Sequence, residues 1–283
     1  MRKYNSLIIL LLLLTGCTQR KEYDLPDDLL YKGQPIHPCQ VLATQFGDRT
    51  RFEPRSVECV EDGYNHHLDY SSPCFRETTI PKHHAEDAYW SELENNYMYV
   101  GSYKNNHIIL GYSHDTGTTG CFSFLTLLKR EGDTIANVGE IASGDRGHGG
   151  IIDIISLDNN LLRYIQSATI GFIMKQLTNA PTEIHFPYFL SGVYLTYEVN
   201  LDGPMEYMTY PSQIIGLLFD QDSYEVSDHP DYLYDETFQL EHSFYTIANK
   251  FIQNGKRELN LKEAKIFAAE VTHYMQNKIW NYK

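Results

Sequence analysis

Short runs of β-prone residues alternate with polar turns over residues 97–166, and this alternation is the clearest pattern in the chain. Val, Ile, Tyr, Phe and Thr dominate the runs, as expected of strands. Three dipeptides that tolerate the positive φ of a tight hairpin separate the runs in pairs: Asn105-Asn106, Gly132-Asp133 and Asn159-Asn160. The pattern therefore predicts three successive hairpins, which form an antiparallel meander of about six strands, long enough to curl or to close as a barrel.

The pattern changes to a helical period near the C-terminus. Apolar residues recur every three or four positions over residues 236–253 and 261–275, which predicts two amphipathic helices. Asn260 and Glu263 have the spacing of a capping box at the start of the second helix. A short linker joins the two helices, so we expect an αα-hairpin that buries its apolar stripes on the sheet.

Two further patterns complete the fold prediction. Residues 168–177 have the composition of a short helix, and strand-like runs continue over residues 184–219. The predicted fold class is α+β, an antiparallel β-meander sheet with the C-terminal αα-hairpin packed on it. We expect a single domain over residues 36–283. Its parts are an irregular segment rich in proline and cysteine at 36–90, a β-rich core at 97–219 and the helical hairpin at 235–283.

The N-terminus has the order of charge and hydrophobicity of a signal peptide. A basic start precedes an apolar run over residues 7–14, which is far shorter than the ~20 residues that cross a bilayer as a helix. Leu14-Thr15-Gly16-Cys17 follows directly and resembles the lipobox of bacterial lipoprotein precursors. The resemblance covers residues 1–18. It implies that a lipid is attached to Cys17, that residues 1–16 are removed and that the new N-terminus is acylated.

The same resemblance implies a location. Two or more acyl chains anchor a protein stably, whereas one chain does so only marginally. Residues 17–35 are polar and suit a lipidated tether. Thr18 replaces the Asp that would resemble an inner-membrane retention signal. We therefore expect a protein whose N-terminal lipid binds the outer membrane and whose domain faces the periplasm.

The remaining cysteines are even in number, as expected in an oxidising compartment. They are Cys39, Cys59, Cys74 and Cys121. Three disulfide pairings are possible, of which we favour Cys39–Cys59 with Cys74–Cys121. The alternative makes Cys121 a nucleophile with His148 as its base; we disfavour it because an exposed thiolate is readily oxidised there.

Composition and charge narrow the range of partners. The 283 residues are 42% hydrophobic, which excludes intrinsic disorder. The net charge is −14 and falls to −16 when Arg2 and Lys3 leave with the signal peptide. The chain offers no cluster of Lys and Arg, so nucleic acid is excluded as a partner. Anionic lipid headgroups repel such a domain, so it should hang from its anchor.

The densest glycine run extends from Gly144 to Gly150 and includes Asp145, Arg146 and His148. In a functional interpretation, backbone amides together with Arg146 and His148 bind an anion, and Asp145 orients the histidine. We favour a structural interpretation, in which a strand connection needs positive φ at several positions. The run lacks the Gly-Lys-Ser/Thr of a nucleotide-binding loop.

Histidine and tyrosine are both abundant. The pairs at 66–67 and 83–84 lack the spacing of converging zinc ligands, so we predict no metal and no cofactor. The 22 tyrosines suit either recognition of glycan or protein, or core packing. We favour core packing, because both faces of the first hairpin are apolar or aromatic.

These patterns favour a non-enzymatic function. We expect a binding, accessory or inhibitor module for an envelope protein or glycan. The alternative is a glycan or peptidoglycan hydrolase that uses His148 or carboxylates near the glycine run. The carboxylates considered are those of Glu140, Asp145 and Asp153.

Overall fold

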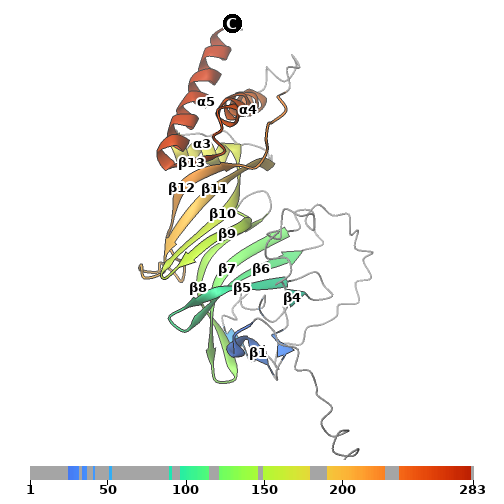
Figure 1. Ribbon diagram of the computed structural model, residues 1–283, viewed down its shortest axis with the longest axis vertical. Coiled ribbons are helices and arrows are strands. Elements are labelled where there is room, and N and C mark those ends of the chain that lie inside the picture. The colour runs from blue at the N-terminus through green and yellow to red at the C-terminus, as the bar shows by residue number, and fades with distance from the viewer. Residues whose placement is uncertain are drawn as a thin grey trace, which may run out of the picture. The chain divides into compact units, whose positions relative to one another are not determined.

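The computed structural model describes two compact units, divided between Pro35 and Ile36 (Figure 1). In the first unit, one 3-10 turn leads into two short antiparallel strands; these are η1 (Asp27–Leu29), β1 (Leu30–Tyr31) and β2 (Gln34–Pro35). All other described elements belong to the second unit. The described residues are 25–31, 34–36, 41, 51–52, 89–90, 96–114, 121–145, 149–178, 190–226 and 236–281.

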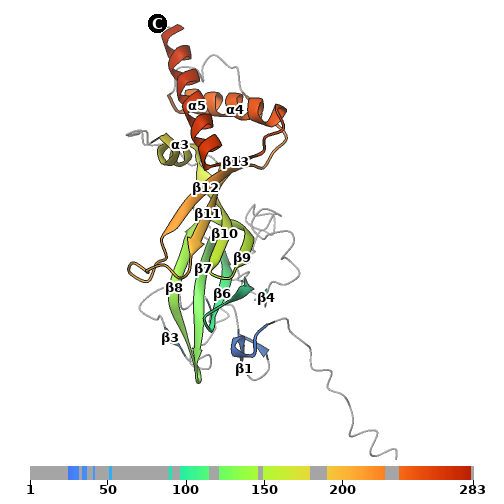
Figure 2. The same cartoon turned by 60° about the vertical axis from the view of Figure 1, so that its left-hand side comes forward.

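A six-stranded antiparallel sheet forms the first half of the second unit (Figures 1 and 2). Its spatial order is β3-β8-β7-β6-β5-β4, so four long strands follow one another as a meander and two short strands lie at the edges. The strands are β3 (Arg51–Phe52), β4 (Tyr89–Trp90), β5 (Asn96–Tyr103), β6 (Asn106–His114), β7 (Cys121–Glu131) and β8 (Thr134–Asp145).

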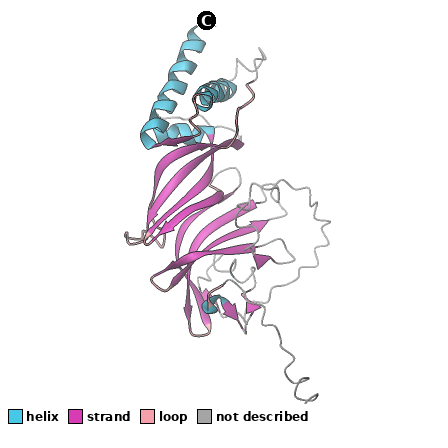
Figure 3. Ribbon diagram, viewed as in Figure 1, coloured by secondary structure: helices cyan, strands magenta, loops and turns pink. Residues whose placement is uncertain are grey.

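A five-stranded antiparallel sheet follows, in the spatial order β13-β12-β11-β10-β9. Its strands are β9 (Ile151–Asp158), β10 (Leu161–Thr169), β11 (Leu190–Asn200), β12 (Ser212–Phe219) and β13 (Glu258–Asn260). Three helices gather at the end of this sheet (Figure 3). They are α3 (Ile170–Thr178), α4 (Glu236–Gln253) and α5 (Leu261–Asn281).

The predicted α+β class is confirmed, as are the three hairpins and the C-terminal helical hairpin. The meander is divided between two sheets, however, and among the described strands neither sheet closes into a barrel. The first two predicted hairpins form β5 to β8, whereas the third, β9–β10, begins the other sheet. The separation occurs between Asp145 and Ile151, at the glycine-rich connection.

The turn of the first hairpin lies one residue earlier than predicted. Lys104 and Asn105 have positive φ, at 47° and 63°, and Tyr103 pairs with Asn106. The register buries Tyr103 and His107 in the β5–β6 hairpin, and burial fixes register more strongly than turn preference does. In the other two hairpins, Gly132 (φ 63°) and Asn159 (φ 56°) lie in the predicted turns.

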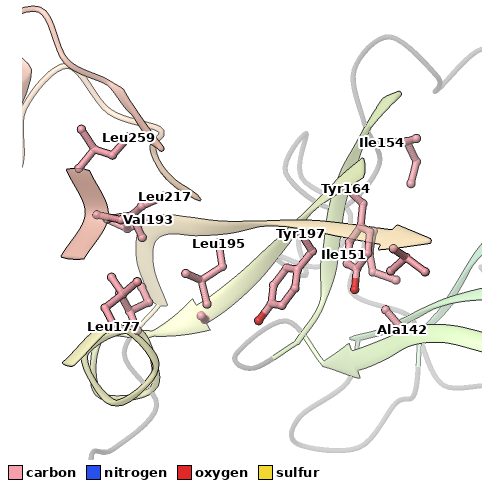
Figure 4. Close-up of a cluster of buried hydrophobic side chains, with 14 of the residues drawn as sticks. Ala142, Ile151, Ile154, Tyr164, Leu177, Val193, Leu195, Tyr197, Leu217 and Leu259 are labelled. Atoms are coloured by element: carbon pink, nitrogen blue, oxygen red, sulfur yellow. The ribbon is translucent and has the colours of Figure 1, made fainter. Parts of the chain in front are cut away.

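One apolar core spans both sheets and the helices. On β11 the side chains of Val193, Leu195 and Tyr197 are buried while those between them are partly exposed, which is the period of two expected of a half-covered sheet. Figure 4 shows Leu177 of α3 at one end of this buried face and Ala142 of β8 at the other. The helices and the neighbouring sheet thus share in covering it.

Aromatic rings join the helical hairpin to the sheet. The ring of Phe267 on α5 lies 4.9 Å from that of Phe244 on α4 and 5.4 Å from that of Phe219 on β12. The predicted capping box is confirmed at the start of α5. The Glu263 amide donates to Asn260 Oδ1 at 3.1 Å, and the Asn260 amide donates to Glu263 Oε2 at 3.3 Å. The cap fixes where α5 begins, directly after β13.

Substitution of Phe267 tests whether this aromatic contact stabilises the domain. Phe267 is fully buried, so Phe267→Ala should lower the free energy of unfolding by about 3–5 kcal/mol. Its neighbour Ile266 is 46% exposed, and Ile266→Ala should change that energy by no more than about 0.5 kcal/mol. Urea unfolding followed by circular dichroism measures both values. Equal losses in the two variants would contradict the packing described.

Candidate functional site

The glycine-rich connection is explained by a close approach of two backbones. A Cβ on Gly144 would lie 2.2 Å from the carbonyl carbon of Gly149, which leaves no room for any side chain. Gly149 also has a φ of 84°, which favours glycine. Asp145 is the last residue of β8, whereas Arg146 and His148 lie outside the described residues. The geometry supports the structural interpretation, and the anion site stays a prediction.

Hydrogen bonds fix the end of this connection to both sheets. The Ile151 amide donates to the buried Ser123 Oγ on β7 at 2.6 Å. The Gly149 amide donates to the Ser167 carbonyl on β10 at 2.9 Å, and the Ser167 amide returns a bond to the Gly150 carbonyl at 2.7 Å. The start of β9 is therefore held by one strand of each sheet.

The carboxylates considered for glycan hydrolysis have local structural contacts. Glu140 Oε1 accepts a hydrogen bond from Ser143 Oγ at 2.6 Å, and Asp153 Oδ1 accepts one from the Ile154 amide at 2.7 Å. They lie on β8 and β9, which belong to different sheets. Within the described ranges, no group of three or more His, Cys, Asp or Glu side chains is placed to hold a metal ion.

The predicted cysteine sites fall largely outside the described part of the chain. Cys17, Cys39, Cys59 and Cys74 are not among the described residues. Cys121 begins β7, but its side chain is not described. The lipid attachment and the disulfide pairs therefore stay predictions.

Core packing explains many of the tyrosines. Among the described residues, seven tyrosines are at most 8% exposed: Tyr97, Tyr103, Tyr112, Tyr164, Tyr197, Tyr210 and Tyr224. Burial raises the pKa of Tyr197 to about 12, in keeping with a phenol that serves packing. Tyr207 differs from all of these, because its side chain is fully exposed.

Tyr207 lies in a tight turn within the loop that joins β11 to β12. The Glu206 amide donates to the Thr209 carbonyl at 2.9 Å, and the Thr209 amide donates to the Glu206 carbonyl at 2.8 Å. Tyr207 and Met208 form the two central positions, with φ values of 50° and 67°. We call residues 205–209 the Tyr207 turn.

The Tyr207 turn is fastened to β8. The Glu140 amide donates to the Met208 carbonyl at 2.7 Å, and the Tyr210 amide donates to the Glu140 carbonyl at 2.9 Å. Gly139 makes room beside these bonds. A Cβ at Gly139 would lie 2.9 Å from the Tyr210 ring and 3.0 Å from the sulfur of Met205. The turn thus lies against the six-stranded sheet, while it belongs to the loop between two strands of the other sheet.

A polar cluster holds the start of the same loop. Tyr103 Oη and Lys104 Nζ both donate to Asp202 Oδ1, and Asn160 Nδ2 donates to Asp202 Oδ2 at 2.9 Å. The Asp202 amide donates to Asn200 Oδ1 at 2.9 Å. Asp202 therefore joins the β5–β6 turn, the β9–β10 turn and the β11–β12 loop. The hydrogen bond from Lys104, followed by that from Tyr103, lowers the pKa of Asp202 below its ordinary value.

The Tyr207 turn presents a small apolar surface on a rigid frame. Met205 and Met208 are 45% and 44% exposed, and Tyr207 between them is fully exposed. Positive φ in a bulky residue costs about 1–3 kcal/mol, so Gly and Asn are the usual residues there. Asn105, Gly132 and Asn159 of the hairpin turns follow this rule. Lys104 does not, but its ammonium group gains a hydrogen bond to Asp202. Tyr207 and Met208 do not follow it either: Tyr207 gains no burial that would offset the cost, and Met208 is covered only in part.

Sequence reasoning missed this surface because tyrosine and methionine are more often buried. One signal was available in the flanking residues. Gly203-Pro204 and Pro211 bracket the segment, and prolines so placed disfavour a regular strand that continues through either position. Large apolar residues in an irregular segment between two prolines are candidates for an exposed binding surface.

Glycine substitution tests the strain in the Tyr207 turn. The double variant Tyr207→Gly with Met208→Gly should leave the free energy of unfolding unchanged or raise it by up to about 1 kcal/mol, because glycine adopts positive φ without penalty. Gly132→Ala is the matched control. Its Cβ would meet no atom within 4 Å, so it isolates the cost of positive φ and should destabilise by about 1 kcal/mol. A marked loss of stability in the double variant would contradict strain in this turn.

The pH dependence of stability tests the Asp202 cluster. Because the folded-state pKa of Asp202 is lowered, its contribution is complete above the ordinary value of 3.8 and is lost as the pH falls through the folded-state pKa. Asp202→Asn should therefore have a lower melting temperature than wild type at neutral pH. Below about pH 4 the two melting temperatures should approach each other, because Asp202 of the wild type becomes protonated. Glu225→Gln, at an exposed carboxylate, is the control and should show no such trend. A constant difference at all pH values would contradict the assignment.

Comparison with known proteins finds no protein-family model, no curated protein and no solved structure that matches this chain. In the part of the chain that the structure describes, every helix is too short or too polar to cross a membrane. The candidate site therefore rests on the geometry of the Tyr207 turn itself.

Proposed function

We propose that this protein is a bacterial lipoprotein of the cell envelope that acts as a non-enzymatic binding or accessory module. The observation that carries the binding function is the Tyr207 turn, whose strained backbone presents Tyr207, Met205 and Met208 to solvent. Tyr and Met are enriched in the buried centres of protein interfaces. A turn held at both ends by hydrogen bonds loses little conformational entropy on binding, which favours affinity.

The N-terminal sequence supports the envelope location. Leu14-Thr15-Gly16-Cys17 follows a basic start and a short apolar run, in the order of a lipoprotein precursor. Acyl chains on Cys17 then hold the protein to the outer membrane, and the domain faces the periplasm. The net charge of −16 that remains after Arg2 and Lys3 are removed favours a domain that extends away from anionic headgroups, with its contact surface open to other envelope components.

Mass spectrometry of the mature N-terminus tests the proposed anchoring. The wild-type protein should begin at Cys17, carry the mass of acyl chains and sediment with the outer membrane. Cys17→Ser should abolish acylation and release the domain from the membrane, because serine offers no sulfur for the lipid. Cys39→Ser is the matched control, since it removes a cysteine, and with it the predicted Cys39–Cys59 disulfide, but leaves the lipidation sequence intact; its N-terminus should stay acylated.

Two results would contradict the proposed function. An unmodified wild-type chain that begins at another residue, or one recovered from the soluble interior of the cell, would refute the anchoring. Release of soluble fragments from purified peptidoglycan by the wild type, abolished by His148→Ala, would instead support a hydrolase.

A further inference from the structure

We infer that the Tyr207 turn inserts into an apolar pocket of a second envelope protein, and that basic residues border this pocket. The inference rests on the proposed function and deepens it, because it identifies the chemistry of the partner at the same site. Three properties of the turn lead to it: the large side chains at positions of positive φ, the fixed shape of the turn and its charge.

The first property is the choice of side chains. Both central positions of the turn have positive φ, where glycine would relieve the backbone. The folded domain gains no packing from Tyr207, which is fully exposed, and little from Met208. We therefore attribute the presence of these two side chains to contact with another molecule. A phenol ring flanked by flexible thioethers fits an apolar pocket with a polar group near its base.

The second property is the fixed shape of the turn. Backbone bonds join Met208 and Tyr210 to Glu140 of β8, and the Asp202 cluster holds the start of the loop. A partner therefore meets a preformed projection rather than a segment that must fold on binding. Three exposed side chains are too few for a whole interface of ~1,200 Å² or more. Three such side chains can instead form the central anchor of a larger interface, where a few residues supply most of the binding energy.

The third property is charge, and it decides between classes of partner. Glu206 lies exposed between Met205 and Tyr207, and the described residues provide no ion pair for its carboxylate. The chain as a whole carries −14. An anionic membrane surface repels such a tip, and so does a second copy of the chain. A protein pocket bordered by Lys or Arg complements it.

Site-specific photo-cross-linking in cells tests this inference with the full-length, lipidated protein. The photoreactive amino acid p-benzoylphenylalanine replaces Tyr207 in one strain and Ile266 in another. Ile266 is a matched control, because it is similarly apolar, 46% exposed and remote from the turn on α5. We expect one protein to be cross-linked at position 207 and not at position 266. Mass spectrometry then identifies that protein for purification.

Binding of the purified partner completes the test. Tyr207→Gly with Met208→Gly should weaken binding by about 30-fold, as truncation of an anchor residue does, while the domain stays folded. Glu206→Gln should weaken binding and reduce its dependence on salt concentration, because it removes the charge that faces the basic border. Ile266→Ala should leave the affinity unchanged.

Each other outcome overturns the inference. Cross-linking of position 207 to phospholipid, or binding of the domain to vesicles of phosphatidylethanolamine and phosphatidylglycerol, would indicate a membrane contact. Cross-linking to a second copy would indicate self-association. No cross-link, equal cross-links at both positions, or unchanged affinity in the double variant would remove the site altogether. Failure of the proposed anchoring is distinguishable, because it appears as an unmodified Cys17 whatever position 207 contacts.

Discussion

The fold depends on the contact between two glycine backbones at the point where the chain passes from one sheet to the other. Gly144 and Gly149 approach so closely that a single Cβ on Gly144 would lie 2.2 Å from a backbone carbon. This contact lets Ile151 start β9 beside β7, where the Ser123 hydroxyl accepts its amide. Two open sheets can then bury one shared core instead of forming one continuous meander.

The arrangement of the sheets determines which turns meet. The β5–β6 turn belongs to one sheet, whereas the β9–β10 turn and the β11–β12 loop belong to the other, and Asp202 joins all three. The loop then crosses to β8, where Glu140 bonds to Met208 and Tyr210. The Tyr207 turn is thus held by both sheets, although its own sequence contains little that would make it rigid. Its shape is a consequence of tertiary structure rather than of local preference.

The same distinction explains what could be predicted from the sequence. The hairpins and the capping box of Asn260 and Glu263 were predictable, because turn residues and helix caps act over a few positions. The division into two sheets was not, because strands of both sheets have the same alternation and the same β-prone residues. The shift of the first turn to Lys104 followed from the burial of Tyr103, which turn preference does not report. Tyr207 was hidden for a related reason: tyrosine is as common in a core as on a surface, and its full exposure is a result of how the loop packs on β8.

The residues that stabilise this domain differ from those that the Tyr207 turn exposes for contact. Stability comes from the shared core and from aromatic contacts such as that of Phe267 with Phe244, and the side chains of Tyr207 and Met208 belong to neither. The strain in the turn, about 1–3 kcal/mol for each residue, is small beside the loss expected when a buried aromatic ring of this core is removed. The stability of the core can therefore offset the cost of holding Tyr207 and Met208 at positive φ, a conformation that these residue types disfavour. Because neither side chain belongs to the shared core, changes to them alter what the turn can bind without altering whether the domain folds. Residues on such a turn can be substituted, and the binding surface changed, without loss of the fold.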